Sequence, residues 1–381
     1  MKKIFVFSVS RSDYDRYFPI LEALQKENKV KLYLILSSAH YAEKFGRTIN
    51  FIDKKFNIIK RKKISKIFDD KPNKVIDNLA DDIKFLSQNV YKHKPDIVIV
   101  LGDRLEMIVA PIVSIPYNIP VIHLYGGAIT EGAVDELVRH AITKLSHYHF
   151  VALNSYKKRL LQLGEENWRI KVSGVHGVNL FKSFKKMNLN LLSEKLSFDL
   201  KKPYLLLTFH PTTLENKKIS NQTNALVKAI KRSNLNTIIT YPNADIGHDK
   251  IINLMKKKLY NKKKYLIIKN CGIEIYSNLM RNCLAIIGNS SSGIVEATSF
   301  NVPAINIGSR QNGKYKPENV IDCSNSSSDI YNKILMIKRK KFLKKIKNPY
   351  ESKISIKQMV RMILSVKKND KFMRKKFINL I

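Results

Sequence analysis

Residues 286–300 read IIGNSSSGIVEATSF, an apolar run that ends in Asn-Ser-Ser-Ser-Gly and then changes at once into a helical pattern. A strand, a Ser/Gly turn and a helix in this order are typical of an α/β domain. Such a turn aims backbone N–H groups and the positive end of the helix at one point, where a diphosphate can be held. Serine also caps ordinary helices. The stretch therefore predicts an α/β unit and favours phosphate binding over simple capping.

Short apolar runs alternate with amphipathic stretches in both halves of the chain. The predicted strands are 4–9, 31–38, 96–103, 120–127, 148–153, 169–174, 204–211, 237–243, 265–270, 284–291 and 303–308. Strands that are apolar throughout and separated by helices indicate parallel sheets covered on both faces. We therefore predict two doubly wound, Rossmann-like α/β domains, residues 1–178 and 179–355, with a linker near 175–200. Helical periodicity predicts a further C-terminal helix within 356–381.

A chain of 381 residues, 44% of them apolar, is long enough for two domains with substantial cores. No window approaches the roughly 18 consecutive apolar residues of a membrane span, and the apolar run at the start is too short for a secretion signal. The three cysteines form no CxxC pair. This usage disfavours a disulfide framework or a zinc cluster, and it favours a reducing, cytoplasmic location.

The formal net charge of +38 is compatible with nucleic acid or an anionic membrane as a partner. The lysines are nevertheless spread along the whole chain, and the densest basic stretch, 338–377, lacks a nucleic-acid motif. We interpret most of this charge as solvated surface and expect no specific nucleic-acid partner. A basic surface also suits a substrate that carries phosphate.

Polar residues gather where the predicted strands end. They are Ser10-Arg11, Gly102-Asp103-Arg104, His123 with Gly126-Gly127, His210-Pro211, Pro242-Asn243, and Asn289 to Gly293. Ligands of open parallel sheets bind beyond the carboxyl ends of the strands. One polar strand end is a routine helix cap, whereas six in both halves predict a binding cleft between two domains.

Seven residues at or near these ends match a nucleoside diphosphate. The candidates are Arg11, Arg16, Ser291, Ser292, Gly293, Glu296 and Arg310. Guanidinium groups match phosphate oxygens in a bidentate manner, although each arginine could instead be an ordinary surface residue. The serines and the glycine would supply hydroxyl groups and close backbone approach. The glutamate, one turn into the helix, would accept hydrogen bonds from a ribose diol.

The acid–base candidates begin with a helix predicted after Gly126-Gly127. Its expected buried stripe is Val134, Leu137, Val138, Ala141, Ile142 and Leu145. Glu136 would lie on another face, within reach of Arg139 at i+3 and His140 at i+4. The alternative is a surface ion pair, but the position of this helix after a strand end favours a role in the site.

Two further candidates end strands themselves. Asp103 follows a buried strand, where an acid is either a helix cap or a site residue. His210 ends the first strand of the second half, where it would exchange a proton near neutral pH.

Taken together, the motifs SRSDY, GDRLE, GGAITEGAVDELVRHAITKLSHYHF, HPTT, YPNADIG, GNSSSGIVEA and NIGSRQNG occur in the order typical of a known family. Over residues 3–325 the sequence resembles the hydrolysing UDP-N-acetylglucosamine 2-epimerases of sialic and legionaminic acid biosynthesis. The resemblance implies a GT-B-like fold with the nucleotide in the interdomain cleft. It also implies a homodimer, and chemistry that needs neither NAD nor a metal.

The resemblance further implies a reaction and roles for individual residues. Enzymes of this type eliminate UDP from the sugar and then add water with inversion at C2, which gives a free N-acetylmannosamine-type sugar. Asp103, Glu136 and His210 match the acid–base positions. The seven diphosphate and ribose candidates match nucleotide-binding positions, and Tyr276 matches an aromatic position near the uracil.

One departure from the family pattern bears on activity. The family has Glu after the Gly-Gly pair, a participant in proton transfer at C2, whereas this chain has Ala128. Losing such a group costs on the order of a hundredfold in rate. Glu131, three residues on, is the candidate replacement. Asp15 and Asn179 are milder departures.

Three readings therefore stay open from the sequence. The leading one is a hydrolysing epimerase acting on UDP-N-acetylglucosamine or UDP-N,N'-diacetylbacillosamine, with a GDP-linked sugar also compatible. A GT-B glycosyltransferase would use the same cleft but would require an acceptor. A non-catalytic nucleotide-sugar binder would result if Ala128 abolishes turnover.

Overall fold

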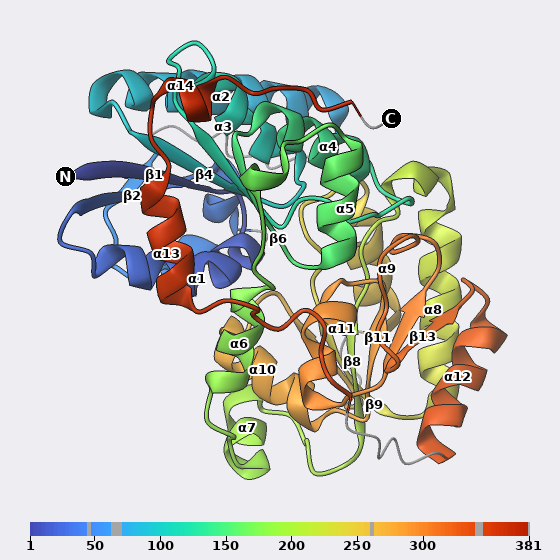
Figure 1. The fold of residues 1–381 in the computed structure, drawn as a ribbon. Coiled ribbons are helices and arrows are strands. Elements are labelled where there is room, and N and C mark those ends of the chain that lie inside the picture. Colours follow the sequence, from blue (N-terminus) through green and yellow to red (C-terminus); the bar gives the residue numbers. More distant parts are fainter. Residues whose placement is uncertain (44–46, 62–70, 260–262, 340–345, 380–381) are drawn as a thin grey trace.

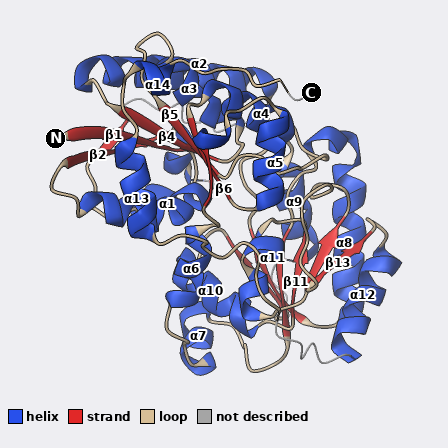
Figure 2. Cartoon of the chain, in the orientation of Figure 1, coloured by secondary structure: helices blue, strands red, loops and turns tan. Residues whose placement is uncertain are grey.

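The computed structural model describes residues 1–43, 47–61, 71–259, 263–339 and 346–379, which form two α/β domains (Figure 1). Each domain has a parallel sheet with helices packed against it (Figure 2). In the described residues the strand orders are β3-β2-β1-β4-β5-β6-β7 and β10-β9-β8-β11-β12-β13. Both orders reverse direction beside the first strand of the domain, as in doubly wound folds. The predicted fold class is confirmed.

The strands of the first sheet are β1 (Lys2–Ser8), β2 (Val30–Leu36), β3 (Ile58–Lys60), β4 (Ile97–Leu101), β5 (Val121–Leu124), β6 (Tyr148–Val151) and β7 (Ile170–Val172). Those of the second sheet are β8 (Tyr204–Thr208), β9 (Asn236–Thr240), β10 (Tyr265–Ile268), β11 (Ala285–Gly288), β12 (Ala304–Ile307) and β13 (Val320–Cys323).

The helices of the first half are α1 (Arg11–Gln25), α2 (Pro72–His93), α3 (Val109–Ser114), α4 (Asp135–Leu145), α5 (Asn154–Gln162), α6 (His176–Ser183) and α7 (Leu189–Leu196). Those of the second half are α8 (Ile219–Ser233), α9 (His248–Leu259), α10 (Gly272–Asn282), α11 (Ser292–Val295), α12 (Ser327–Arg339), α13 (Ile356–Ser365) and α14 (Asp370–Met373). Short 3₁₀ turns include Leu105–Ile108, Thr213–Lys218 and Ala297–Phe300.

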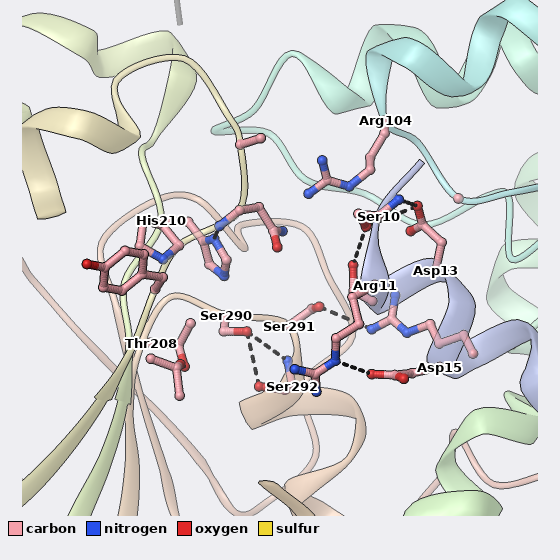
Figure 3. Close-up of a pocket in the computed structure, with 18 of the residues that line it drawn as sticks. Ser10, Arg11, Asp13, Asp15, Arg104, Thr208, His210, Ser290, Ser291 and Ser292 are labelled. Atoms are coloured by element: carbon pink, nitrogen blue, oxygen red, sulfur yellow. Dashed lines mark hydrogen bonds and ion pairs between the residues drawn. The ribbon is translucent and has the colours of Figure 1, made fainter. Parts of the chain in front are cut away.

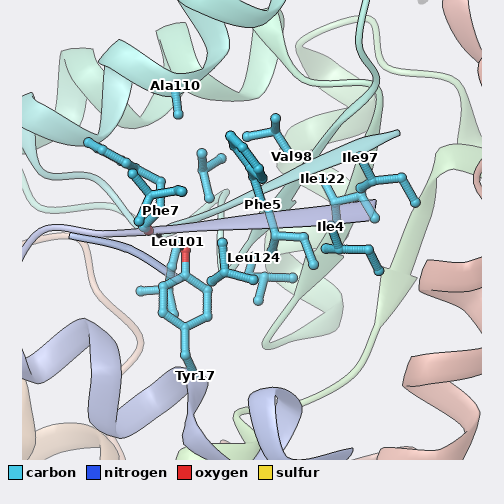
Figure 4. Packing of buried hydrophobic residues seen from close by; sticks show 14 of the residues in the cluster. Ile4, Phe5, Phe7, Tyr17, Ile97, Val98, Leu101, Ala110, Ile122 and Leu124 are labelled. Carbon is cyan, nitrogen blue, oxygen red and sulfur yellow. Dashed lines mark hydrogen bonds between the residues drawn. The ribbon is translucent and has the colours of Figure 1, made fainter. Parts of the chain in front are cut away.

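The central strands of the first sheet are buried because helices cover both of their faces. Every residue of β4 and β5 is buried, and Phe5 and Phe7 of β1 lie in the same apolar core (Figure 4). From α1, the Tyr17 hydroxyl donates a hydrogen bond to the Phe7 carbonyl at 3.1 Å. This hydrogen bond fixes α1 to the sheet near the end of β1, next to the polar residues Ser10 and Arg11.

The sequence analysis missed two strands and overestimated one helix. β3 and β13 lie at sheet edges and are only partly buried, so their apolar signal is weak. The helix expected from GIVEATSF is the four-residue α11, which passes into the 3₁₀ turn Ala297–Phe300.

The last part of the chain returns to the first domain, where α13 lies against α1 (Figure 1). Met359, Val360 and Ile363 of α13 belong to the first domain's apolar core. The segment before α13 lies beside the segment that leaves the first domain after β7: the Lys353 N–H donates to the Ser173 carbonyl at 2.8 Å. The boundaries at 178 and 355 stay predictions.

Candidate functional site

A cavity of about 280 Å³ lies between the carboxyl ends of the two sheets. Figure 3 shows Ser10, Arg11 and Arg104 from the first domain facing His210 and the Ser290–Ser292 turn from the second. Five of the six polar strand ends line this cavity. The exception is the one at His123, which is fully buried and hydrogen-bonds through Nε2 to the Gly102 carbonyl at 2.7 Å.

The start of α1 forms one wall, and a buried carboxylate holds it in place. The Ser10 N–H donates to Asp13 Oδ2 at 2.9 Å, which closes the turn between β1 and the helix. This places Arg11 at the cavity, where its Nε donates to Asp15 Oδ2 at 3.1 Å. Asp15, a departure from the family pattern, therefore fixes the guanidinium of Arg11.

Arg16, one turn further along α1, reaches the second domain. Its Nη2 lies 3.4 Å from Ser291 Oγ and 3.3 Å from Glu296 Oε1. The second carboxylate oxygen of Glu296 is buried and has no hydrogen-bond partner among the described residues. A buried acceptor of this kind needs an explanation, and a ligand hydroxyl is one. The arginine wall and the serine turn therefore meet at one point.

The serine turn itself consists of linked hydroxyl groups. Ser292 Oγ lies 3.0 Å from both Ser290 Oγ and the Tyr276 hydroxyl of α10. Gly293 does not line the cavity: its N–H donates to the Ser290 carbonyl at 3.2 Å, and an added Cβ would lie 3.3 Å from that of Ala304. The glycine lets α11 pack on the sheet, while the serines face the open space.

Arg310 lies in the loop after β12 and belongs to the same wall. Its Nη1 donates to the Asn289 carbonyl at 3.3 Å, and its Nη2 lies 3.5 Å from Asp245 Oδ2. Arg104 of the first domain lies 3.7 Å from the other oxygen of Asp245. Asp245 thus joins arginines from both domains across the cavity.

Asp103 is held by a fully buried arginine. Arg139 of α4 donates to Asp103 Oδ2 through Nε at 3.1 Å and also through Nη2. Burial alone would raise the pKa of Asp103, but the Arg139 charge and hydrogen bonds lower it to about 2. Asp103 therefore stays ionised at neutral pH.

Asp135, and not its neighbour Glu136, is the residue of α4 that faces the cavity. Burial raises the pKa of Asp135 to about 7, helped by the nearby Asp103 and Asp245. Glu136 points away, accepts from the Thr130 N–H at 2.6 Å, and pairs with Arg139 and His140. Burial opposes ionisation of Glu136, but the hydrogen bond to His140 and the Arg139 charge lower its pKa to about 2.

The predicted buried stripe of this helix was confirmed at Val138 and Ile142 but wrong at Val134 and Leu137, which explains why Asp135 was missed. Leu137 is 76% exposed and Val134 is 38% exposed. The buried face instead runs through Val138, Arg139, Ile142 and Thr143. Asp135 lies four residues before Arg139 and seven before Ile142, so it shares that face. A predicted buried face that included Arg139 would also have included Asp135.

The loop before α4 holds Ala128, which stands where the family has a glutamate, and Glu131, its candidate replacement. Glu131 is exposed and lies outside the cavity lining, and its N–H donates to the Asn312 carbonyl of the second domain at 3.2 Å. The methyl group of Ala128 packs in an apolar cluster with Val151 and Tyr156. Neither side chain lines the cavity.

His210 lines the cavity but does not titrate near neutrality, contrary to the prediction. The Asn243 N–H donates to His210 Nδ1 at 3.1 Å, so the neutral ring carries its proton on Nε2. Burial, followed by the Arg310 charge, lowers the pKa of His210 to about 3. His210 is thus a neutral N–H donor.

Comparison with known protein families identifies this arrangement. A family model described as UDP-N-acetylglucosamine 2-epimerase matches residues 22–364. The chain belongs to the UDP-N-acetylglucosamine 2-epimerase family.

Two relatives in the epimerase family are named as hydrolysing 2-epimerases of a nucleotide-linked diacetylbacillosamine. A GDP/UDP-N,N'-diacetylbacillosamine 2-epimerase (hydrolyzing) of Campylobacter jejuni is 36% identical over 84% of both chains. A UDP-N,N'-diacetylbacillosamine 2-epimerase (hydrolyzing) of Legionella pneumophila is 33% identical over 84% of this chain and 85% of its own.

A solved structure confirms the GT-B-like fold expected for the family. The Neisseria meningitidis UDP-GlcNAc 2-epimerase, bound to UDP-GlcNAc, superposes with a TM-score of 0.78 at 19% identity and covers 96% of this chain and 100% of its own.

The cavity thus gathers most, but not all, of the predicted site residues. Lining it are Arg11, Arg16, Asp103, His210, Tyr276, Ser291, Ser292, Glu296 and Arg310. Outside its lining are Glu131, Glu136 and Gly293. Sequence reasoning missed Asp135 and Asp245, whose importance depends on contacts between the domains. Lys314 also lines the cavity. In the described ranges no group of three or more His, Cys, Asp or Glu side chains is placed to hold a metal ion, and no helix is long and apolar enough to cross a membrane.

Proposed function

We propose that this epimerase-family chain is a hydrolysing 2-epimerase of a UDP-linked 2-acetamido sugar. The substrate would be UDP-N-acetylglucosamine or UDP-N,N'-diacetylbacillosamine, and the product a free N-acetylmannosamine-type sugar used for sialic or legionaminic acid. The names of the relatives support the reaction class. The observation that carries the proposal is the contact of Arg16 with Ser291 and Glu296 in the cavity that Asp103 and Asp135 also line.

The nucleotide would span the two walls. Arg11 and Arg16 from one domain and Ser291 and Ser292 from the other would hold the diphosphate, because both sets of donors face the same space. The unpartnered oxygen of Glu296 would accept from the ribose diol. Tyr276, whose hydroxyl bonds Ser292, would then lie beside the uracil.

The sugar would lie among Asp103, Asp135 and His210. Asp135 is the acid–base residue, because a carboxyl group with a pKa of about 7 gives and takes protons at neutral pH. Asp103 supplies a fixed negative charge, and His210 donates its Nε2–H to a substrate oxygen without releasing the proton. Glu136 is a positioning residue, since it orients Arg139, which holds Asp103.

The test is nucleotide release by the purified protein. Incubation with each of the two UDP-sugars in D₂O should release UDP and a free sugar that carries one deuterium at an inverted C2. If neither substrate releases UDP, the proposed function fails for these sugars. A matched incubation with GDP-linked sugars would establish the choice of base.

A second candidate, a nucleotide-sugar binder without turnover, is favoured by one observation. Ala128 replaces the family Glu, and its methyl group is packed among apolar side chains away from the cavity. Tight UDP binding in calorimetry without UDP release from any sugar would select this candidate. We also propose a cytoplasmic homodimer, which sedimentation of the purified protein would test.

A further inference from the structure

The loop between β12 and β13 carries a lysine to the catalytic side of the cavity. The loop packs backbone to backbone on the first domain: the Asn312 carbonyl accepts from the Glu131 N–H at 3.2 Å. A Cβ at Gly132 would lie 2.8 Å from Arg310 Cα, so only a hydrogen fits between the two segments. Lys314 follows this contact by two residues in the same loop, and it lines the cavity together with Asp103 and Asp135.

The surroundings of Lys314 are unusual for a lysine. Its Nζ donates to Gln311 Oε1 at 3.3 Å, and among the described residues no carboxylate forms an ion pair with it. The charged groups that act on it are Asp103 from the loop after β4, Arg139 from α4, Arg16 from α1, and Arg310 from its own loop. One carboxylate, already paired with Arg139, faces three guanidinium groups.

This environment favours the neutral amine. Burial lowers the pKa of Lys314 to about 7; Asp103 opposes the shift, and the arginines add to it. A lysine that served only to hold diphosphate would be expected to remain a full cation in the free protein. A lysine that accepts a proton at neutral pH needs the lowered value instead.

Lys314 lies close to the segment in which Ala128 stands where the family has a glutamate. The segment 128–132, which lacks the family's acid, is the segment on which the lysine loop packs. The nearest acid of that segment, Glu131, is exposed and lies outside the cavity lining. We propose that Lys314 is a catalytic residue that exchanges the proton at C2 of the sugar, together with Asp135 from the other domain. This inference rests on the proposed function.

The steps balance as follows. In the elimination, the neutral amine of Lys314 takes the C2 proton, the C–H electron pair becomes the C1=C2 bond, and UDP leaves with the electrons of the C1–O bond. In the hydration, the Asp135 carboxylic acid gives its proton to the opposite face of C2 while a water oxygen bonds to C1. The proton that this water loses restores the acid form of Asp135, and the Lys314 ammonium group releases its proton to solvent.

Three variants test the role, with UDP release as the readout. Lys314→Met removes the amine, and Lys314→Arg keeps a cation that cannot lose its proton at neutral pH. Lys316→Met is the matched control, because Lys316 lies in the same loop, pairs with Asp322 at 2.8 Å and does not line the cavity. Thermal unfolding of each variant checks that it is folded.

We expect both Lys314 variants to lose about a hundredfold or more in kcat with KM changed less than about threefold, and the control to match the wild type. Lys314→Met should still hydrate added 2-acetamidoglucal in the presence of UDP, since that half-reaction uses Asp135. Full activity of Lys314→Arg would show that only the charge matters and would overturn the proposal. Lys314→Met within threefold of the wild type, or losing both half-reactions equally, would also overturn it. A wild type that never releases UDP would overturn the proposed function as well.

Discussion

The two walls of the cavity differ in how they satisfy their polar groups. The wall from the first domain is ionic: Arg139 is fully buried and joins Asp103 and Glu136. The wall from the second domain also holds charged groups such as Arg310 and Glu296, but its serine turn consists of linked neutral hydroxyl groups, with Ser292 between Ser290 and Tyr276. The Arg139 cluster of the first wall is therefore complete before the ligand arrives, whereas the serine turn of the second wall offers donors that a diphosphate would use. We infer that the Arg139 cluster positions Asp103 for the chemistry, and that the serine turn, together with Arg16 of the first domain, binds the nucleotide.

The largest effect is expected from breaking the ionic wall at its centre. Arg139→Met leaves Asp103 and Glu136 without their shared cation, which for a buried pair costs about 3–5 kcal/mol. The free energy of unfolding in urea should fall by that amount, and activity should be lost. Arg361, which is exposed on α13, provides the control: Arg361→Met should change stability by less than about 0.5 kcal/mol. A loss below 1 kcal/mol for Arg139→Met would contradict the ionic description of this wall.

The next effect separates the two neighbouring acids of α4. Asp135→Asn should lower kcat by about 10²–10⁴-fold with little loss of stability, because Asp135 faces the substrate. Glu136→Gln should lower kcat less and stability more, since Glu136 supports Arg139. Steady-state kinetics and urea unfolding on both variants make the comparison, and the reverse order would show that the sequence-based choice of Glu136 was right.

The pH dependence of the hydration half-reaction tests the role of Asp135. Its pKa is raised to about 7, so its acid form predominates below that pH and is lost as the pH rises through it. The rate at which the wild type hydrates added 2-acetamidoglucal in the presence of UDP, the half-reaction that uses this acid form, should therefore fall tenfold per pH unit well above pH 7. A hydration rate that stays flat between pH 6 and 9 would remove Asp135 from the proton transfer.

A smaller effect is expected where Arg16 of the first domain meets the serine turn of the second domain. Arg16→Met removes a charged donor from the diphosphate, which is worth about 1.5–3 kcal/mol, or roughly 10–150-fold in the Kd of UDP. Ser291→Ala removes a neutral donor, worth about 0.5–1.5 kcal/mol. Isothermal titration calorimetry measures both, and an unchanged Kd in both variants would show that UDP does not bridge the two walls.

The smallest effect separates the sequence prediction from the geometry. Glu131→Gln should change kcat less than about threefold, because the side chain is exposed and outside the cavity lining. A hundredfold loss would restore Glu131 as the replacement for the missing acid.

The sequence predicted those features that depend on local pattern. The apolar strands and polar strand ends were sufficient for the two sheets and for the cleft residues such as Arg16, Ser291 and His210. The features that it missed depend on which way a helix faces or on contacts between distant segments. The face of α4 was misread because a buried arginine, Arg139, looks polar in a hydrophobic pattern. The lowered pKa of Lys314 was not predicted because, apart from Gln311 and Arg310 of its own loop, the groups that act on it are Asp103, Arg139 and Arg16 of the other domain.

The most direct test of this account is a crystal structure of the protein with UDP. We predict diphosphate oxygens within hydrogen-bond distance of both Arg16 and Ser291, the ribose at Glu296, and Asp135 facing the vacant sugar position. UDP bound outside this cavity, or held by one domain with Arg16 still paired to Glu296, would contradict it.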